Sequence, residues 1–322
     1  MMIKKKWNLP WEMLPAIFAL AWPTMLEQLL QTAVQYIDTA MVGSLGTQAT
    51  AAVGATSTVN WLVSSTISAL GVGFLAFVSQ ANGAGEHRRV RRASSQAVLA
   101  VLVSGIFFTA LTLGVSSYVP VWMQVDPSIQ QLAAQYFFIL YAPMLFRTAT
   151  IMFGTLLRSV GDSKTPMRVG LLVNVVNVVL NFLLIYPERQ WMGIPLWGAG
   201  MGVIGAAAAS AASFVIGGIC ITVVYWKHPV ISPAGQSLKP DFEILKPCLK
   251  VALPNALQRF GTSLGYVAFA SMINSIGEVA TAAHTIANTV ESAFYIPGYG
   301  MQTAAATLAG NALGAQDNKR AR

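Results

Sequence analysis

The sequence predicts an all-α polytopic membrane protein with a six-helix N-terminal lobe and the first two helices of a second lobe that repeats the first in parallel. Three observations support this fold class. Of the 322 residues, 55% are hydrophobic and only 10% are charged, whereas about 25% of residues are charged in an ordinary soluble domain. Eight apolar runs are each long enough to span a bilayer, which takes about 20 residues. Finally, an ungapped repeat relates the start of the chain to its end.

The apolar runs give the order of elements along the chain. They cover residues 14–42, 50–80, 93–120, 129–156, 166–186, 198–226, 247–273 and 279–311. Several runs exceed the minimum length and contain prolines, so we expect tilted or kinked helices. The longest polar connection follows Lys227 and contains several prolines. We therefore divide the chain into an N-terminal lobe (1–226), a cytoplasmic linker (227–246) and a partial C-terminal lobe of two helices (247–322).

Charges in the connections predict the orientation in the membrane. Basic residues cluster in every second connection and near both chain ends, whereas the alternate connections contain only Asp126, Glu188, Arg189 and Glu278. Because basic loops stay in the cytoplasm, we expect an integral protein of the plasma (inner) membrane with both ends of the chain cytoplasmic. This topology accounts for the net charge of +8, so we expect membrane lipid as a partner and no nucleic acid.

The repeat becomes visible when the chain is shifted by 231 positions. Ala21 and Pro23 then align with Ala252 and Pro254, and the pair Gly83–Ala84 aligns with Gly314–Ala315. Six predicted helices separate the copies, and this even number makes the copies parallel, related by an axis along the membrane normal. The second copy contains counterparts of only two helices, which predicts a fragment of a longer protein or a truncated gene.

Seven segments carry a resemblance to a known family. They are QYIDTAMVGSLG around Asp38, SQANGAG, LLRSVGDSKTPM, NVVNVVLNFLLIY, GVIGAAAAS, AAHTIANTVESAFYIPGYG and GNALGA. In this order and spacing they resemble the multidrug and toxic compound extrusion (MATE) family, and the chain would be about two-thirds of a usual member. The resemblance implies two six-helix lobes that form a V around a central cavity. It also implies export of amphipathic, often cationic compounds, driven by inward flow of H+ or Na+.

Four polar residues are candidates for the coupling-ion site. Asp38 lies toward one end of the first predicted helix, where a carboxylate costs about 2.5–3.5 kcal/mol if it reaches the membrane centre. Asn177 and Asn181 lie one turn apart on one face of the fifth. The resemblance implies that these asparagines join Asp38 in the site, together with the hydroxyl of Ser210. One branch of the family has an aspartate where Asn181 stands, so this chain has one carboxylate fewer. The alternatives are a solvated helix-end aspartate and asparagines that only pair helices.

Four further charges fall midway along predicted helices: Glu27, Arg147, Arg259 and Glu291. Two of each sign indicate ion pairing between helices or across the cavity. Glu27 and Arg259 lie near matching repeat positions, so we expect them to face each other across the lobe interface. Contact with a cationic substrate is the alternative. The resemblance favours H+ over Na+, because sodium-coupled members often carry an acidic residue in helix seven, and none lies between Val251 and Asn274.

The predicted function is therefore an ion-coupled antiporter that exports small amphipathic, cationic compounds. We expect a monomer with no cofactor beyond the coupling ion, and no enzymatic activity, because the sequence contains no HExxH motif and no paired GxGD aspartate. The two isolated cysteines predict no metal site. One alternative is a lipid-linked oligosaccharide flippase of the same superfamily, which should have a more basic cavity. Another is a non-functional truncated transporter fragment.

Overall fold

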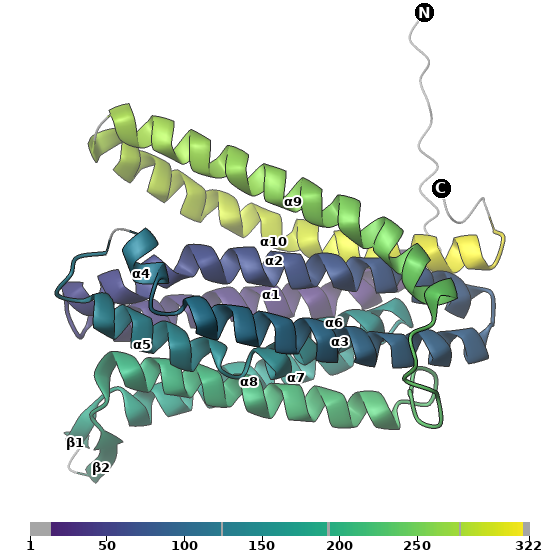
Figure 1. Cartoon of the computed structure of the whole chain (residues 1–322), viewed down its shortest axis with the longest axis horizontal. Helices are drawn as coiled ribbons and strands as arrows, with labels where there is room; N and C mark the ends of the chain where they lie inside the picture. Colours follow the sequence, from purple (N-terminus) through teal and green to yellow (C-terminus); the bar gives the residue numbers. More distant parts are fainter. Residues whose placement is uncertain (1–13, 124, 192–193, 277, 318–322) are drawn as a thin grey trace, which may run out of the picture.

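Long helices dominate the structure (Figure 1). The computed structural model describes residues 14–123, 125–191, 194–276 and 278–317. The described elements are α1 (Leu14–Gly43), α2 (Thr47–Gly83), α3 (His87–Val115), α4 (Val119–Trp122), α5 (Gln130–Tyr141), α6 (Met144–Ser159), α7 (Lys164–Leu184), β1 (Pro187–Trp191), β2 (Ile194–Ala199), α8 (Gly202–Lys227), α9 (Phe242–Ile276) and α10 (Glu278–Gly314).

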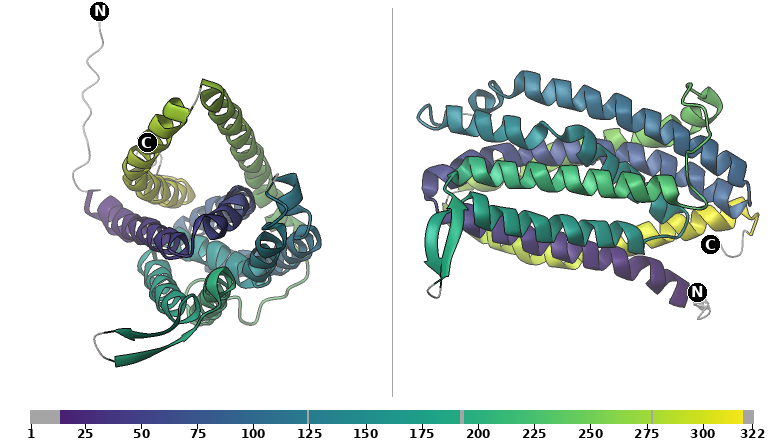
Figure 2. Two further views of the ribbon diagram at one scale, coloured as in Figure 1. Left: turned by 90° about the vertical axis from the view of Figure 1, so that its left-hand side faces the viewer. Right: turned by 90° about the horizontal axis from the view of Figure 1, so that it is seen from below.

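The two ends of the helix bundle differ in charge. One end holds the α2–α3 turn, the α6–α7 turn, the α8–α9 connection, the start of α1 and the end of α10 (Figures 1 and 2). Arg88, Arg92, Lys164 and Lys227 all lie in or next to these connections. We call it the basic end, and we call the opposite end, which carries β1 and β2, the hairpin end. The charge alternation predicted along the sequence is therefore also a separation in space.

The outside of the bundle is apolar. Four described helices, α2, α3, α7 and α8, are long and apolar enough to cross a membrane, and the pair α5–α6 makes a fifth if counted as one span. Large hydrophobic side chains on α3 and α7, including Val103, Phe107 and Val175, are more than half exposed. Such a surface suits hydrocarbon rather than water, and the protein is an integral membrane protein. The remaining predicted spans correspond to α1, α9 and α10.

The fourth predicted span consists of two helices in the structure. α5 ends at Tyr141, α6 begins at Met144, and the two are bent by 49°. Pro143 lies in the break, where its ring and its missing N–H prevent the helix from continuing. The sequence predicts a kink at this proline but not a complete interruption.

Other boundaries also differ from the sequence prediction. The strands β1 and β2, at 187–191 and 194–199, pair antiparallel where a loop and the start of a helix are expected. α8 begins only at Gly202, after Gly200 has adopted a positive φ of 64°. α9 begins at Phe242 rather than at 247, because Asp241 Oδ1 accepts from the backbone N–H of Glu243 at 3.1 Å and caps the helix. The connection between the lobes is therefore 228–241.

Helices α9 and α10 pack on α1 and α2 about a local two-fold axis. A Cβ on Gly83 would lie 1.9 Å from the carbonyl oxygen of Asn311, and a Cβ on Gly314 would lie 1.9 Å from the carbonyl oxygen of Gln80. Residues 80 and 311 differ by 231 positions, as do residues 83 and 314. Reciprocal contacts of this kind are produced by a two-fold axis. The parallel repeat predicted from the sequence is confirmed.

Candidate functional site

Four polar side chains meet in the hairpin-end half of the N-terminal lobe. Asp38 comes from α1, Asn177 and Asn181 come from α7, and Ser210 comes from α8. Asn181 Nδ2 donates to Asp38 Oδ1 at 2.6 Å. The Asn177 amide lies between the carboxylate and Ser210. Its nitrogen donates to the two Asp38 oxygens at 2.9 and 3.2 Å, and its oxygen accepts from Ser210 Oγ at 3.1 Å. A carboxylate only accepts hydrogen bonds, so the network itself selects this amide orientation.

Close packing of α7 and α8 brings Ser210 to the asparagines. A Cβ on Gly205 would lie 2.5 Å from the carbonyl oxygen of Leu184, and a Cβ on Gly217 would lie 2.3 Å from Val173 Cγ2. These glycines flank Ser210 on α8 and let the two helices approach closely. The small-residue segment GVIGAAAAS therefore positions a hydroxyl.

Burial of the site is uneven. Asn181 is 1% exposed and Asn177 is 6% exposed, whereas Asp38 is only partly buried. Asn181 Oδ1 is buried and has no hydrogen-bond partner among the residues that the structure describes. An unsatisfied buried acceptor costs about 1–3 kcal/mol. Beside a carboxylate, this oxygen can accept a hydrogen bond from a protonated carboxyl group or help to coordinate a small cation.

The structure adds Tyr136 to the surroundings of this site. Tyr136, on α5, is 8% exposed and lies within electrostatic reach of both Asp38 and Arg147. It therefore belongs to the electrostatic surroundings of both the carboxylate and the guanidinium. Sequence reasoning missed Tyr136, because a tyrosine in an apolar run has no spacing that sets it apart from packing aromatics.

Arg147 has only neutral partners among the described residues. Its Nη1 donates to Asn60 Oδ1 at 2.5 Å, and its Nη2 donates to Ser64 Oγ at 2.8 Å. The guanidinium carbon lies 4.9 Å from the ring centroid of Phe214, within the range of a cation–π interaction. The expected ion pair is therefore not made by Arg147, which instead ties α6 to α2 and α8.

The expected pairing of Glu27 with Arg259 is wrong. Glu27 Oε2 lies 2.5 Å from Arg158 Nη2, an ion pair in which both side chains are less than one-fifth exposed. Arg259 Nε donates to Asn255 Oδ1 at 2.9 Å, within α9. Glu27 pairs inside its own lobe because Arg158, at the end of α6, is the cation that packing brings to it. The repeat offset indicated matching positions but could not show which side chains meet.

Glu291 lies apart from the other charges. It is exposed on α10, and its Oε1 accepts from the hydroxyl of Tyr295 at 2.7 Å. Of the eight candidate residues, the structure thus brings together the four of the coupling-ion set. The four mid-helix charges occupy separate places.

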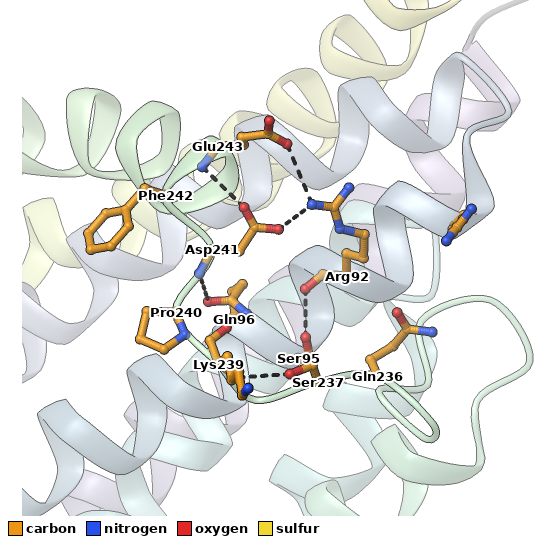
Figure 3. A pocket seen from close by; sticks show the side chains of 11 residues that line it. Arg92, Ser95, Gln96, Gln236, Ser237, Lys239, Pro240, Asp241, Phe242 and Glu243 are labelled. Atoms are coloured by element: carbon orange, nitrogen blue, oxygen red, sulfur yellow. Dashed lines mark hydrogen bonds and ion pairs between the residues drawn. The ribbon is translucent and has the colours of Figure 1, made fainter.

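A second polar cluster lies at the basic end, where the connection between the lobes docks on α3 (Figure 3). It surrounds a hollow of about 430 Å³. Arg92 bridges Asp241 at 2.5 Å and Glu243 at 3.5 Å. Gln96 Nε2 donates to the carbonyl of Lys239 at 2.8 Å, and Gln96 Oε1 accepts from the N–H of Asp241 at 2.9 Å. These charges and amide groups are already paired, so the cluster holds the connection in place.

Comparison with known proteins gives the family. A family model described as MatE matches residues 23–183 and 254–322. These two stretches lie in the two lobes and leave out the connection between them. The match therefore includes Asp38, Asn177 and Asn181 as well as the repeat in α9 and α10.

Relatives of known sequence or structure are similar over nearly the whole chain. A probable multidrug resistance protein, NorM, from Thermotoga maritima is 30% identical over 316 residues, which are 96% of this chain and 67% of that protein. A probable multidrug resistance protein, YoeA, from Bacillus subtilis is 27% identical and covers 92% of this chain and 64% of its own length. The outward-facing structure of a multidrug resistance MATE family transporter of the MOP superfamily has a TM-score of 0.86 at 26% identity, over 95% of this chain and 66% of that one. The chain spans about two-thirds of the length of these relatives.

Proposed function

The chain belongs to the MatE family of membrane transporters, and on that premise we propose that it is an ion-coupled antiporter that exports small amphipathic, cationic compounds across the cytoplasmic membrane. H+ is favoured over Na+ as the coupling ion. The observation that carries the proposal is the Asp38–Asn177–Asn181–Ser210 network, in which one carboxylate is held by two amides from a neighbouring helix. The basic end faces the cytoplasm, because basic connections stay on that side.

A change of charge at Asp38 has structural consequences. The ionised carboxylate accepts from Asn177 and Asn181 and so holds α1 to α7. A bound proton neutralises the carboxylate and weakens these charge-assisted bonds. α1 contains Pro23, which removes one bond of the helix ladder and allows α1 to bend or repack. Proton binding then favours the arrangement that releases substrate.

The energetics are sufficient. A tenfold concentration step costs about 1.4 kcal/mol, and one charge moving across about 100 mV yields about 2.3 kcal/mol. Exchange of one proton for one monovalent cation moves no net charge and is driven by the pH gradient alone, whereas two protons per cation add the potential term and, helped by a pH gradient, can sustain a roughly hundredfold gradient of substrate.

The decisive experiment changes Asp38 to Asn, which preserves shape but cannot titrate. The matched control is Asp126→Asn, because Asp126 is an exposed aspartate in the connection before α5, and hydrogen bonds from Ser128 lower its pKa so that it stays ionised. We expect cationic dye efflux from proteoliposomes with an imposed pH gradient to be lost in Asp38→Asn and retained in Asp126→Asn.

A second readout does not need turnover. Adding dye to the purified protein in weakly buffered detergent solution should release protons from the parent chain and from Asp126→Asn, but not from Asp38→Asn. Proton-driven efflux that persists in Asp38→Asn would refute the assignment and direct attention to Glu27 and Glu291. If efflux depends on Na+ at constant pH, the coupling ion is Na+ rather than H+.

A further inference from the structure

At the basic end, α10 is fastened to two helices of the N-terminal lobe by side-chain hydrogen bonds. Asn82 Nδ2, on α2, donates to Asn311 Oδ1 at 2.8 Å. Asn311 Nδ2 donates to the carbonyl of Ser159 at 3.4 Å, and Thr307 Oγ1 donates to the carbonyl of Arg158 at 3.3 Å. One amide, that of Asn311, therefore connects α10, α2 and α6.

These bonds satisfy the end of α6. The last carbonyls of a helix have no partner within the helix, and α6 ends at Ser159, which is fully buried. In a low-dielectric environment such a carbonyl needs a donor. The carbonyl of Arg158 also accepts from the backbone N–H of Gly161 at 3.0 Å. The donor to the carbonyl of Ser159 comes from the C-terminal lobe, so this carbonyl is capped by a side chain that leaves when the lobes part.

The backbones of α2 and α10 touch at the same place. Besides the reciprocal contacts of Gly83 and Gly314, a Cβ on Gly310 would lie 2.0 Å from Ser79 Oγ, and Ser79 is fully buried. Residues 79 and 310 are also 231 positions apart, so this contact lies on the local two-fold axis. Even one added methyl group at these positions has to push the helices apart.

Among the residues whose side chains the structure describes, close contact between the lobes lies toward the basic end. On α9 and α10, the described residues that are buried include Cys248, Ala252, Ala304 and Thr307, all in the basic-end halves. Toward the hairpin end the two helices diverge from α2 (Figure 1). The described side chains there include Leu264 and Tyr295, which are both more than half exposed.

We propose that Asn311 is the positioning residue of a reversible latch that closes the two lobes at the basic end. The latch consists of Asn82, Thr307 and Asn311 with the carbonyls of Arg158 and Ser159, and it rests on the proposed function. A transporter that opens alternately to its two sides has to break this contact. The end now closed then becomes the entrance for substrate.

The chemistry of the latch suits a contact that opens. Interhelical hydrogen bonds in membranes are worth on average a factor of about three each in an equilibrium constant. The bonds of Asn311 to α2 and α6 together then contribute about tenfold. Among the described residues, no ion pair joins α10 to α2 or α6. Opening of the latch therefore leaves no charge without its partner.

The test uses a cysteine that is hidden only while the latch is closed. Ser79→Cys replaces the buried hydroxyl on the two-fold axis by a thiol of similar shape. The rate of its reaction with a membrane-impermeant maleimide, on the purified full chain, measures the fraction of time the latch is open. The same chain without Ser79→Cys gives the background from Cys220 and Cys248.

We expect Asn311→Ala to raise the labelling rate of Cys at position 79 about tenfold. The isosteric change Thr307→Val removes one bond and should raise the rate about threefold. Gly83→Ala and Gly314→Ala should raise it by equal factors, because the two-fold axis makes their contacts equivalent. The matched control is Gly298→Ala on α10, where a Cβ has open space and the rate should stay unchanged.

Two results would overturn the latch: equal labelling of the parent chain and Asn311→Ala, or an increase in Gly298→Ala as large as that in Gly314→Ala. Unequal effects of the Gly83 and Gly314 variants would overturn its two-fold geometry. Because labelling needs no substrate, faster labelling without transport would support the latch while contradicting the proposed function. If the chain transports substrate but its labelling rate is unchanged by these variants, the proposed function would be supported and the latch contradicted.

Discussion

At the residue scale, the two partly buried carboxylates of the N-terminal lobe, Glu27 and Asp38, differ in their partners. Glu27 has a counter-ion, Arg158. Asp38 has only amide donors among the described residues. A change of charge at Asp38 therefore breaks no ion pair, whereas a change at Glu27 leaves a buried guanidinium without its partner. This difference supports our proposal that Asp38 exchanges the proton and that Glu27 serves as the structural partner of Arg158.

Asn181→Asp should move the pH dependence of efflux to higher pH. The new carboxylate would lie beside Asp38, where Asn181 Nδ2 now lies 2.6 Å from Asp38 Oδ1, and repulsion between two like charges favours keeping one shared proton. The measurement is the initial rate of dye efflux from proteoliposomes at a series of internal pH values. Asn174→Asp, on the same helix face but outside the network, serves as the control. An identical pH profile for Asn181→Asp and the parent chain would contradict the proposed coupling site.

Glu27→Gln should reduce stability by about 3 kcal/mol, because removing one partner of a buried ion pair leaves the other charge uncompensated. Arg158 Nε already has no hydrogen-bond partner among the described residues. Thermal unfolding in detergent, followed by tryptophan fluorescence, measures the loss. The double variant Glu27→Leu/Arg158→Leu should recover most of it, since no charge remains buried. If Glu27→Gln unfolds at the temperature of the parent chain, the pair does not matter for stability.

At the element scale, hydrogen bonds to a side chain on α2 fix the break between α5 and α6. Asn60 Oδ1, on α2, accepts from the hydroxyl of Tyr141, the last residue of α5, at 3.3 Å. It also accepts from Arg147 Nη1, in the first turn of α6, at 2.5 Å. One amide oxygen thus fastens both sides of the 49° bend. Proline interrupts the helix, and α2 sets the angle at which it resumes.

Asn60→Leu should therefore be strongly destabilising. The variant removes the acceptor shared by the Tyr141 hydroxyl and Arg147 Nη1, and a buried donor left unsatisfied costs about 1–3 kcal/mol, more when the donor is charged. Ser64→Ala is the control, because it removes a single neutral hydroxyl from the same guanidinium and should cost only about 1 kcal/mol. Chemical unfolding of the two variants measures both. Equal losses would mean that Arg147, rather than Asn60, maintains the bend.

The connection between the lobes is a second element fixed by individual side chains. It is fastened to α3 by Arg91, Arg92, Ser94 and Gln96. At its start, His228 Nδ1 accepts from the N–H groups of Val230 and Ile231 at 3.3 and 3.4 Å, and Nε2 lies 3.9 Å from Asp162 Oδ2. Nδ1 can accept only while it carries no proton. The turn therefore depends on the neutral form of the imidazole.

This dependence predicts that the connection loosens in acid. Burial lowers the pKa of His228 below 6.5, and the charge of Asp162 offsets only part of that effect. The undocked segment then binds protons more readily than the docked one, so docking is strongest above pH 6.5 and is lost as the pH falls through the lowered pKa. Limited proteolysis within 229–241 should accelerate between pH 7 and pH 5. His228→Asn, whose side-chain oxygen can accept from the same N–H groups, should remove this acceleration, and unchanged pH dependence in that variant would disprove the role of His228.

At the scale of the whole molecule, the sequence predicts those features that repeat or that carry charge. Hydropathy, the alternation of basic connections and the 231-residue offset predict the spans, the two ends of the bundle and the two-fold packing of α9 and α10 on α1 and α2. These features follow from periodicity along a single chain. Periodicity also places Asn177 and Asn181 on one helix face, but it is the resemblance to the MATE family that implies their meeting with Asp38.

Features that depend on packing between distant segments are not predictable in this way. Arg158 rather than Arg259 pairs with Glu27 because the side chain at the end of α6 reaches α1 within the N-terminal lobe. Asn60, Tyr136 and Asn311 each lie in an apolar run, where a polar residue has no pattern that names its partner. The strands β1 and β2 lack the alternating pattern of a strand, and their backbone pairing is the only sign of them.

The last prediction follows from the contact between the lobes near the basic end. The buried described residues of α9 and α10 lie in the basic-end halves, and exposed ones such as Leu257, Leu264 and Tyr295 lie beyond them. Helices with few buried contacts open locally at low cost. In hydrogen–deuterium exchange on the chain in lipid nanodiscs, peptides from 258–295 should exchange faster than those from 242–252 and 304–314. Peptides from the hairpin-end half of α1 provide the control at the same depth, because α7 covers that half through Asn181. Uniform exchange along α9 and α10 would show that the basic-end contact does not anchor them, and would require another surface to hold the second lobe.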